Sequence, residues 1–240
     1  MYNVGMLEGI KAVAFDIDGT LYPDWKLYVR ILPYFFRNFR FYTRFNRVRK
    51  VMHRTAPLAD FYEYQARLLG AVMHITSSEA KSKIQSICYD GMIPYFKKIR
   101  PYPGVVECIK SMKDAGLKIG ILSDFPPYQK GDLWGIRELS DVCIGSEESG
   151  ALKPSKYPFG ILSIKLEVKP EEILYVGNSV KYDVLKTTGD FICCPVTKPD
   201  TEARNMCILS FGRIGKRNTA FKIKTDLRSI QNRDLLRGSG

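Results

Sequence analysis

The chain has 240 residues, of which 45% are hydrophobic, and its formal net charge is +12 at pH 7. That length allows one or two globular domains with a sizeable core, and no stretch approaches the roughly 20 apolar residues of a membrane-spanning helix. Two histidines and six cysteines without a Cys-x-x-Cys pair disfavour a zinc site. The cysteines are typical of reduced core residues, and the N-terminus lacks a signal-peptide layout, so we expect a cytoplasmic protein.

The first predicted strand, residues 11–16, ends in two carboxylates. Apolar Val13–Phe15 leads into Asp16 and Asp18, and Gly19 lets the backbone turn sharply. Residues i and i+2 of a strand point to the same face, so both carboxylates can reach one small volume. One could act as a nucleophile while the other transfers protons, and together they could hold a divalent cation. The alternative is a pair of solvated turn aspartates.

Residues 23–100 show helical periodicity and few strand signals. In the second of three helical stretches, apolar residues recur at i, i+3 and i+4 spacing (Leu58, Phe61, Tyr62, Leu69 and Val72). Thr76-Ser77-Ser78-Glu79 offers a start for the third helix. A helical insertion at this point could close over the carboxylates as a cap that excludes water. The alternative is that these helices only complete the fold.

The first of these stretches is strongly basic. No acidic residue lies between Asp24 and Asp60, whereas nine bases do: Lys26, Arg30, Arg37, Arg40, Arg44, Arg47, Arg49, Lys50 and Arg54. On one continuous helix, the arginines at positions 37, 40, 44 and 47 would share an arc of roughly 80°. Such a face could be a solvated surface, a surface for an anionic substrate or partner, or a membrane-surface helix. No recognised nucleic-acid-binding module accompanies it, which disfavours nucleic acid as the partner.

From residue 101 onward, strands and helices alternate. Strands are predicted at 118–122, 141–144, 172–176 and 190–193, with helices near 104–115, 156–166 and 179–187. This alternation predicts a parallel sheet covered on both faces. Residues 219–225 predict a further strand and residues 226–236 a short helix.

Polar residues follow these strands where ligands bind in open parallel sheets. Ser123 and Asp124 end one strand, and Asn178 ends another, with Asp183 five residues beyond it. Lys153 follows a glycine-containing turn. A hydroxyl and a lysine suit phosphate oxygens, although a lone Ser-Asp is more often a helix cap and a lone lysine a surface charge.

The four motifs DIDGT, ILSD, LKP and VGNSVKYD, in this order, resemble those of the haloacid dehalogenase superfamily on its phosphatase side. The resemblance implies an α/β fold, a Rossmann-like parallel sheet core with an inserted α-helical cap domain. The core would span residues 1–22 and 101–237 and the cap residues 23–100. The terminal residues 238–240 resemble a cloning remnant.

The resemblance also implies roles for single residues. Asp16 would be the nucleophile that becomes an aspartyl-phosphate, and Asp18 the general acid and base. Ser123 and Lys153 would hold the phosphoryl group, and substrate contacts would come from Gly19, Thr20 and Asp124. Mg²⁺ would be bound by Asp16, the carbonyl of Asp18, Asn178 and Asp183. The substrate would be a small phosphorylated metabolite.

The chain departs from the family pattern at Asn178, where the family usually has an aspartate. An amide oxygen can bind Mg²⁺ but carries no charge. Two alternatives to a phosphatase therefore stay open: a phosphate-binding protein with weak or no turnover, and a phosphomutase that uses the same chemistry. Dehalogenases of the superfamily lack the acid at the position of Asp18, so its presence favours phosphoryl transfer.

Overall fold

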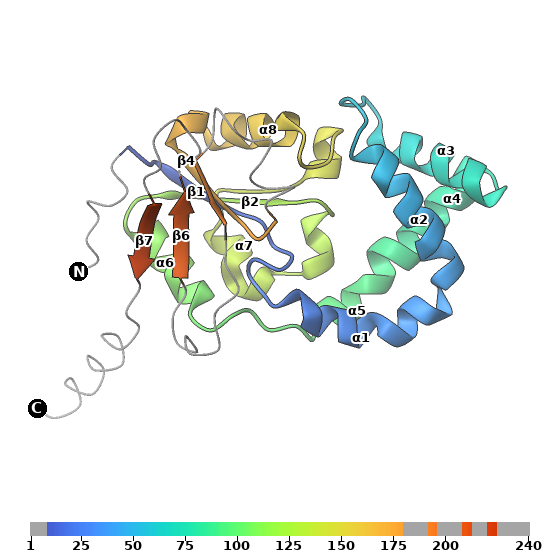
Figure 1. Cartoon of the computed structure of the whole chain (residues 1–240), viewed down its shortest axis with the longest axis horizontal. Coiled ribbons are helices and arrows are strands. Elements are labelled where there is room, and N and C mark those ends of the chain that lie inside the picture. The colour runs from blue at the N-terminus through green and yellow to red at the C-terminus, as the bar shows by residue number, and fades with distance from the viewer. Residues whose placement is uncertain (1–8, 180–191, 196–207, 213–219, 225–240) are drawn as a thin grey trace, which may run out of the picture.

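A five-stranded parallel sheet lies at the centre of the computed structural model, which describes residues 9–179, 192–195, 208–212 and 220–224 (Figure 1). Its strand order is β3-β2-β1-β4-β5. The strands are β1 (Ala12–Phe15), β2 (Lys118–Ser123), β3 (Val142–Gly145), β4 (Ile173–Gly177) and β5 (Ile192–Pro195). The predicted α/β class is confirmed. Each predicted strand is present, although β5 ends two residues later than expected.

Helices cover both faces of the sheet because its strands are apolar on both sides. Val13 and Phe15 of β1 pack in a core cluster with Val105 and Ile109 of helix α6 (Val105–Asp114). The alternating residues of the same strand, Ala12 and Ala14, face helix α8 (Lys156–Leu166) on the other side. Figure 1 shows α8 above the sheet and α6 below it. These two helices correspond to the ones predicted at 156–166 and 104–115.

Between β1 and α6 the described chain forms only helices and loops. The helices are α1 (Asp24–Arg37), α2 (Phe39–Met52), α3 (Phe61–Met73), α4 (Ser77–Lys83), a π-helical turn η2 (Ile84–Tyr89), a 3₁₀ turn η3 (Asp90–Met92) and α5 (Ile93–Phe96). Helices α2, α3 and α4 and the turn η2 share a second core, built from Phe41, Phe45, Phe61, Leu69 and Ile84 among others. Leu27 of α1 and Phe96 of α5 instead pack in the core cluster that contains β1 and α6. This helical insertion projects to the right of the sheet in Figure 1.

Two expectations for the insertion need correction. The first stretch is not one continuous helix: the backbone leaves helical geometry at Asn38 (φ −110°, ψ 23°), so Arg37 ends α1 while Arg40 lies on α2. The four arginines therefore do not share one helical face. Leu58 precedes α3 and belongs to no helix. The predicted helix start at Thr76 is confirmed, because Thr76 and Glu79 form a reciprocal capping box.

The remaining elements are short or peripheral. They are the 3₁₀ turns η4 (Pro127–Lys130), η5 (Leu133–Gly135), η6 (Ser146–Ser149) and η7 (Pro170–Glu172), the helix α7 (Ile136–Leu139), and an antiparallel pair β6 (Ile208–Gly212) and β7 (Ala220–Lys224). The strand predicted at 219–225 is confirmed as β7, whereas β6 was not predicted. The helices predicted at 226–236 and over most of 179–187 lie outside the described residues. Among the described helices, none has the length and apolarity to cross a membrane.

Candidate active site

The carboxyl ends of β1, β2 and β4 meet where the strand order reverses, which is where open α/β sheets bind ligands. Asp16 follows β1 directly, and its amide donates to the carbonyl of Val176 at the end of β4 (2.9 Å). Its side chain is buried, and Lys153 Nζ donates to Asp16 Oδ1 at 2.7 Å. The structure thus joins two of the predicted site residues that lie far apart in sequence.

Asp18 forms a second ion pair beside the first. Lys130 Nζ lies 2.8 Å from Asp18 Oδ2, and the Tyr22 hydroxyl donates to Asp18 Oδ1. Burial, with the nearby charge of Asp18, raises the pKa of Tyr22, so its hydroxyl stays a donor. The Asp18 side chain is 37% exposed, whereas that of Lys130 is 2% exposed. Of the two carboxylates, Asp16 and Asp18, it is therefore Asp18 that solvent and a ligand can reach.

Ser123 ends β2 within this group. Its side chain is fully buried, and its hydroxyl oxygen accepts from Lys130 Nζ at 2.9 Å. One ammonium thus bridges Ser123 and Asp18. The turn that carries Lys130 is fixed by its neighbour Gln129, whose amide donates to the carbonyls of Cys88 (2.9 Å) and Tyr89 (3.1 Å) in the helical insertion.

Asp124 accepts hydrogen bonds that hold the backbone around Lys153. Its Oδ1 accepts from the Ser146 hydroxyl (2.6 Å) and from the Lys153 amide (3.1 Å). Burial disfavours its charge, but Lys153, Arg49 and His53 outweigh burial and hold the pKa of Asp124 below its ordinary value. His53, at the end of α2, also contacts the Lys153 carbonyl through Nδ1 at 2.6 Å.

Asn178 follows β4 and lies against the turn after Asp16. The Thr20 hydroxyl is 3.3 Å from Asp16 Oδ2 and 3.5 Å from Asn178 Oδ1, so both oxygens lie near one hydroxyl. Gly19 has φ +80°, and a Cβ there would meet Asn178 Nδ2 at 2.0 Å, which explains the glycine. In the described part of the chain, no three His, Cys, Asp or Glu side chains form a metal-binding group. The predicted ligand Asp183 lies outside the described residues.

Comparison with known proteins decides the family. Residues 10–185 match the model of the haloacid dehalogenase-like hydrolases, which is most of the chain. The chain belongs to the haloacid dehalogenase-like hydrolase family. The family predicted from the four motifs is thereby confirmed, together with the assignment as a hydrolase.

Curated relatives of this hydrolase are named as phosphatases. A glyceraldehyde 3-phosphate phosphatase of Methanopyrus kandleri is 25% identical over 185 residues, which cover 73% of this chain and 78% of the relative. The pyrophosphatase PpaX of Halalkalibacterium halodurans is also 25% identical, over the same shares of both chains. Several other relatives align over less than half of their own length.

Solved structures share the fold of the hydrolase. The L-2-haloacid dehalogenase of Xanthobacter autotrophicus superposes with a TM-score of 0.54 at 21% identity and covers 81% of this chain and 80% of its own. This superposition supports the predicted α/β fold with its helical insertion. Because the identity is this low, it carries no argument about the reaction.

A second buried charge cluster joins the insertion to the core of the hydrolase. Arg49 of α2 pairs with Glu147 of η6, and their side chains are 8% and 0% exposed. Gln65 accepts from Arg49 at 3.1 Å, and the Tyr89 hydroxyl donates to Glu147 at 2.7 Å. The Arg49 guanidinium also lies 4.4 Å from the ring centroid of Phe125. Burial opposes the charge of Arg49, but Glu147 outweighs it and raises the pKa of Arg49.

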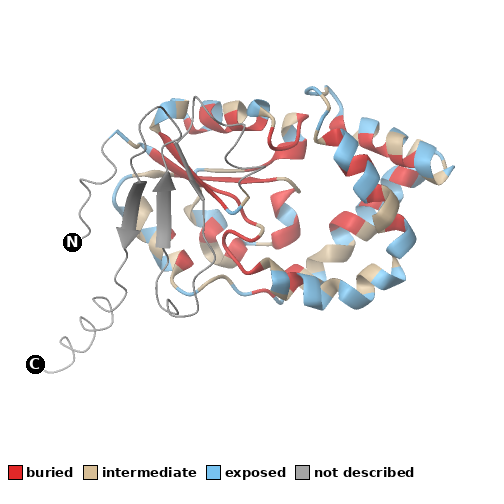
Figure 2. Cartoon of the chain, viewed as in Figure 1, coloured by how far each residue is buried: buried red, intermediate tan, exposed pale blue. Residues whose placement is uncertain are grey.

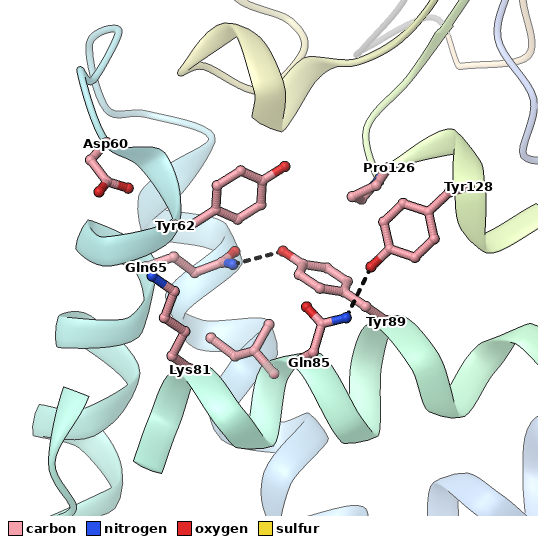
Figure 3. A pocket seen from close by; sticks show the side chains of 9 residues that line it. Asp60, Tyr62, Gln65, Lys81, Gln85, Tyr89, Pro126 and Tyr128 are labelled. Atoms are coloured by element: carbon pink, nitrogen blue, oxygen red, sulfur yellow. Dashed lines mark hydrogen bonds between the residues drawn. The ribbon is translucent and has the colours of Figure 1, made fainter. Parts of the chain in front are cut away.

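A cavity of about 380 Å³ opens between the insertion and the segment after β2 (Figure 3). In Figure 3, Gln65 donates to the Tyr89 hydroxyl (3.1 Å) and Gln85 to the Tyr128 hydroxyl (3.2 Å). None of the predicted site residues lines this cavity. Its lining residues are Asp60, Tyr62, Gln65, Lys81, Ile84, Gln85, Tyr89, Pro126 and Tyr128.

Sequence reasoning missed Lys130 and misjudged Arg49. Lys130 lies in Pro-Pro-Tyr-Gln-Lys, which carries no periodicity and no motif, and only the turn η4 brings it to Asp18. Arg49 is one of the nine bases of the basic stretch, but its side chain is buried. Its spacing of four residues from Phe45 and three from Met52, both apolar, was the available signal.

Proposed function

We propose that this hydrolase is a Mg²⁺-dependent phosphatase that cleaves a small phosphate monoester through a phospho-aspartate at Asp16. The proposal rests chiefly on one observation. A buried aspartate at the end of the central strand is held by a lysine at 2.7 Å, beside a second aspartate that is partly open to solvent. The phosphatase names of the curated relatives support the same class of reaction.

In the first half-reaction, a carboxylate oxygen of Asp16 attacks the phosphorus and the bond to the leaving oxygen breaks. Asp18 gives its proton to that oxygen, which leaves as an alcohol. In the second half-reaction, Asp18 takes a proton from water, the water oxygen attacks the phosphorus, and Asp16 is released with inorganic phosphate. The partial exposure of Asp18 suits a residue that exchanges protons with water and substrate.

Lys153, Ser123 and Lys130 would hold the transferred group. Fixed donors aimed at developing charge commonly account for most of the rate enhancement in such reactions. Lys153 keeps Asp16 in place, and Ser123 donates its hydroxyl to a phosphoryl oxygen. Lys130 lies between Ser123 and Asp18, so it is placed to offset charge next to the leaving oxygen.

The donor set around Asp16 fits a hard cation, because oxygen ligands are those that Mg²⁺ prefers. Asp16, the Asp18 carbonyl and Asn178 would hold it, with Asp183 completing the set. Bound there, Mg²⁺ would neutralise charge on the phosphoryl oxygens. The Thr20 hydroxyl, near both Asp16 and Asn178, orients the two side-chain oxygens.

We also propose that residues 23–100 act as a cap on a core formed by residues 1–22 and 101–237. Arg49, Gln129 and His53 tie the insertion to segments that carry Lys130 and Lys153. Docking of the cap would therefore position the site as well as cover it.

A panel of phosphate compounds, assayed with and without Mg²⁺, tests the reaction. Glyceraldehyde 3-phosphate, pyrophosphate and 2-phosphoglycolate follow the names of the relatives, and p-nitrophenyl phosphate is a generic ester. Mg²⁺-dependent release of phosphate that disappears in Asp16→Asn supports the proposal, with Asp114→Asn as a matched exposed control.

The neutral Asn178 favours a second candidate, a phosphate-binding protein with weak turnover. Saturable binding of inorganic phosphate without hydrolysis of any panel member would support this second candidate and overturn the phosphatase. Isomerisation of a sugar phosphate faster than its hydrolysis would instead indicate a phosphomutase.

A further inference from the structure

Helix α1 presents a large apolar face to solvent. Trp25, Tyr28, Val29, Leu32 and Phe36 are each at least 50% exposed. At 100° per residue these five side chains fall within an arc of roughly 100°. We call these five residues the apolar face. Figure 2 shows exposed residues along the outer side of this helix.

Clustering distinguishes this face from ordinary exposed hydrophobic side chains, which are normally scattered. Twelve large hydrophobic residues are exposed in the described chain, and six of them lie between positions 25 and 39. The opposite side of α1 packs against the rest of the chain. Leu27 is buried in the core cluster, and the Tyr34 hydroxyl donates to the Ile87 carbonyl at 3.0 Å. The helix is therefore held in place with its apolar face outward.

A basic band runs beside the apolar face. Lys26, Arg30 and Arg37 fall within an arc of roughly 40° on α1, next to the side of the helix that carries Val29. Among the described residues, no carboxylate forms a salt bridge with any of these three side chains. An exposed apolar stripe flanked by unpaired bases is the pattern of a helix that lies in a membrane interface.

We propose that the apolar face of α1 docks on an anionic lipid bilayer. The side chains of Trp25 and Phe36 would enter the boundary between headgroups and acyl chains, and the basic band would contact lipid phosphates. Trp and Tyr are the residues that favour this depth. The association is peripheral, because the helix lies in the interface and does not span the bilayer.

Charge argues for lipid over a second copy of this chain. A twofold interface that pairs two α1 helices in antiparallel places both basic bands on the same side, where they repel each other. No acidic residue between Asp24 and Asp60 is available to pair with them. An anionic bilayer instead supplies many phosphates to the same band, and its attraction extends over a Debye length of about 8 Å at physiological salt.

Vesicle sedimentation of the full chain tests the proposal. We expect the wild type to pellet with vesicles of phosphatidylcholine and phosphatidylglycerol and to stay in solution with phosphatidylcholine alone. Trp25→Ser with Phe36→Ser should lower the partition coefficient about tenfold or more, since each removes a large buried apolar surface. Arg30→Glu with Arg37→Glu should lower it roughly 30-fold, and the difference should shrink as salt rises.

Matched controls lie on α8 and on the segment just after it, both on the core. Ile164 is 72% exposed, and Ile164→Ser makes the same apolar-to-polar change outside the proposed surface. Lys165→Glu with Lys169→Glu reverses two exposed charges there. Both controls should bind vesicles as the wild type does. Trp25 fluorescence should also shift to the blue on binding, measured in Trp134→Phe so that Trp25 is the only tryptophan.

Several results would overturn the proposal. The first is a wild type that stays in solution with anionic vesicles at low salt. Another is equal binding by the Trp25 and Phe36 double variant, which would leave charge alone as the cause. A concentration-dependent dimer that Phe36→Ser abolishes, without vesicle binding, would assign the face to a second copy. Binding to duplex DNA in place of vesicles would assign the basic band to nucleic acid.

Discussion

Two buried charge clusters in this hydrolase differ in what they leave open. At the strand ends, Asp16 pairs with Lys153 and Asp18 pairs with Lys130, and the Asp18 side chain is 37% exposed. Between insertion and core, Arg49 and Glu147 are almost wholly enclosed, at 8% and 0%. The enclosed pair has its charge satisfied internally, so it can hold two parts of the fold together. The other cluster retains a carboxylate that a ligand can reach.

This difference separates stability from chemistry. Burying an ion pair costs desolvation that its attraction repays only with good geometry and further hydrogen bonds. Arg49 and Glu147 have these in Gln65, Tyr89 and the Phe125 ring. We therefore expect changes at the enclosed cluster to act mainly on the free energy of unfolding, and changes at the open cluster to act mainly on turnover.

The largest expected effect is at Asp16. Asp16→Asn keeps the side-chain volume but cannot form an acyl phosphate, so turnover should fall roughly 10⁴-fold or more. Its circular dichroism spectrum should stay that of the wild type, and Asp114→Asn should be fully active. Near-normal turnover in Asp16→Asn would show that the nucleophile lies elsewhere.

Substitutions in the enclosed cluster should change the free energy of unfolding, in contrast to the change in turnover expected for Asp16→Asn. Arg49→Met leaves Glu147 buried without its partner and should lower the free energy of unfolding by about 3–5 kcal/mol. Replacing both residues, Arg49→Met with Glu147→Leu, should recover much of that loss. Denaturant unfolding of the single and double variants measures both, with Arg47→Met as the exposed control on the same helix. A double variant no more stable than the single one would contradict this account of the pair.

Substitutions of Lys130 test whether this lysine, in addition to Lys153, contributes a positive charge to catalysis at the open cluster. Lys130→Met should lower kcat about 10²-fold, as the loss of one preorganised donor does, and Lys130→Arg should retain part of the activity. Lys97→Met, on an exposed position, is the control. Steady-state kinetics on one substrate decides the matter, and an unchanged kcat would make Lys130 a structural residue only.

In the proposed Mg²⁺ site, Asn178 would set the charge around the cation. Asn178→Asp adds a negative charge beside Asp16, and it should lower the Mg²⁺ concentration for half-maximal activity about tenfold after desolvation is included. Asp183→Ala should raise it. Asn46→Asp adds the same charge on the exposed side of α2 and should leave the titration unchanged. Identical Mg²⁺ titrations for all of these proteins would mean that the cation binds elsewhere.

Asp124 links the two clusters and gives the smallest effect, a dependence of stability on pH. Because Lys153, Arg49 and His53 hold the pKa of Asp124 below its ordinary value, the folded state is favoured while Asp124 is charged. That stability is present above the unfolded pKa and is lost as pH falls through the folded value. Denaturant unfolding between about pH 7 and pH 3 should therefore show a smaller loss in Asp124→Asn than in the wild type.

The sequence by itself determined the sheet, its order of elements and the family. Strand periodicity and turn residues are local signals, so β1 to β4 and the helices α6 and α8 could be predicted within one or two residues. Asp16, Ser123 and Asn178 could be placed at strand ends for the same reason, because parallel strands bring their carboxyl ends to one edge.

Tertiary structure decided what no local pattern encodes. Lys130 reaches Asp18 only because Gln129 fixes its turn on the insertion, and Arg49 is buried only because Glu147, nearly 100 residues later, meets it there. The break at Asn38 separates Arg37 from the α2 arginines and leaves the apolar face of α1 without a partner in the described chain. These features depend on long-range contacts, whose charge pairing and burial arise only when distant segments pack together.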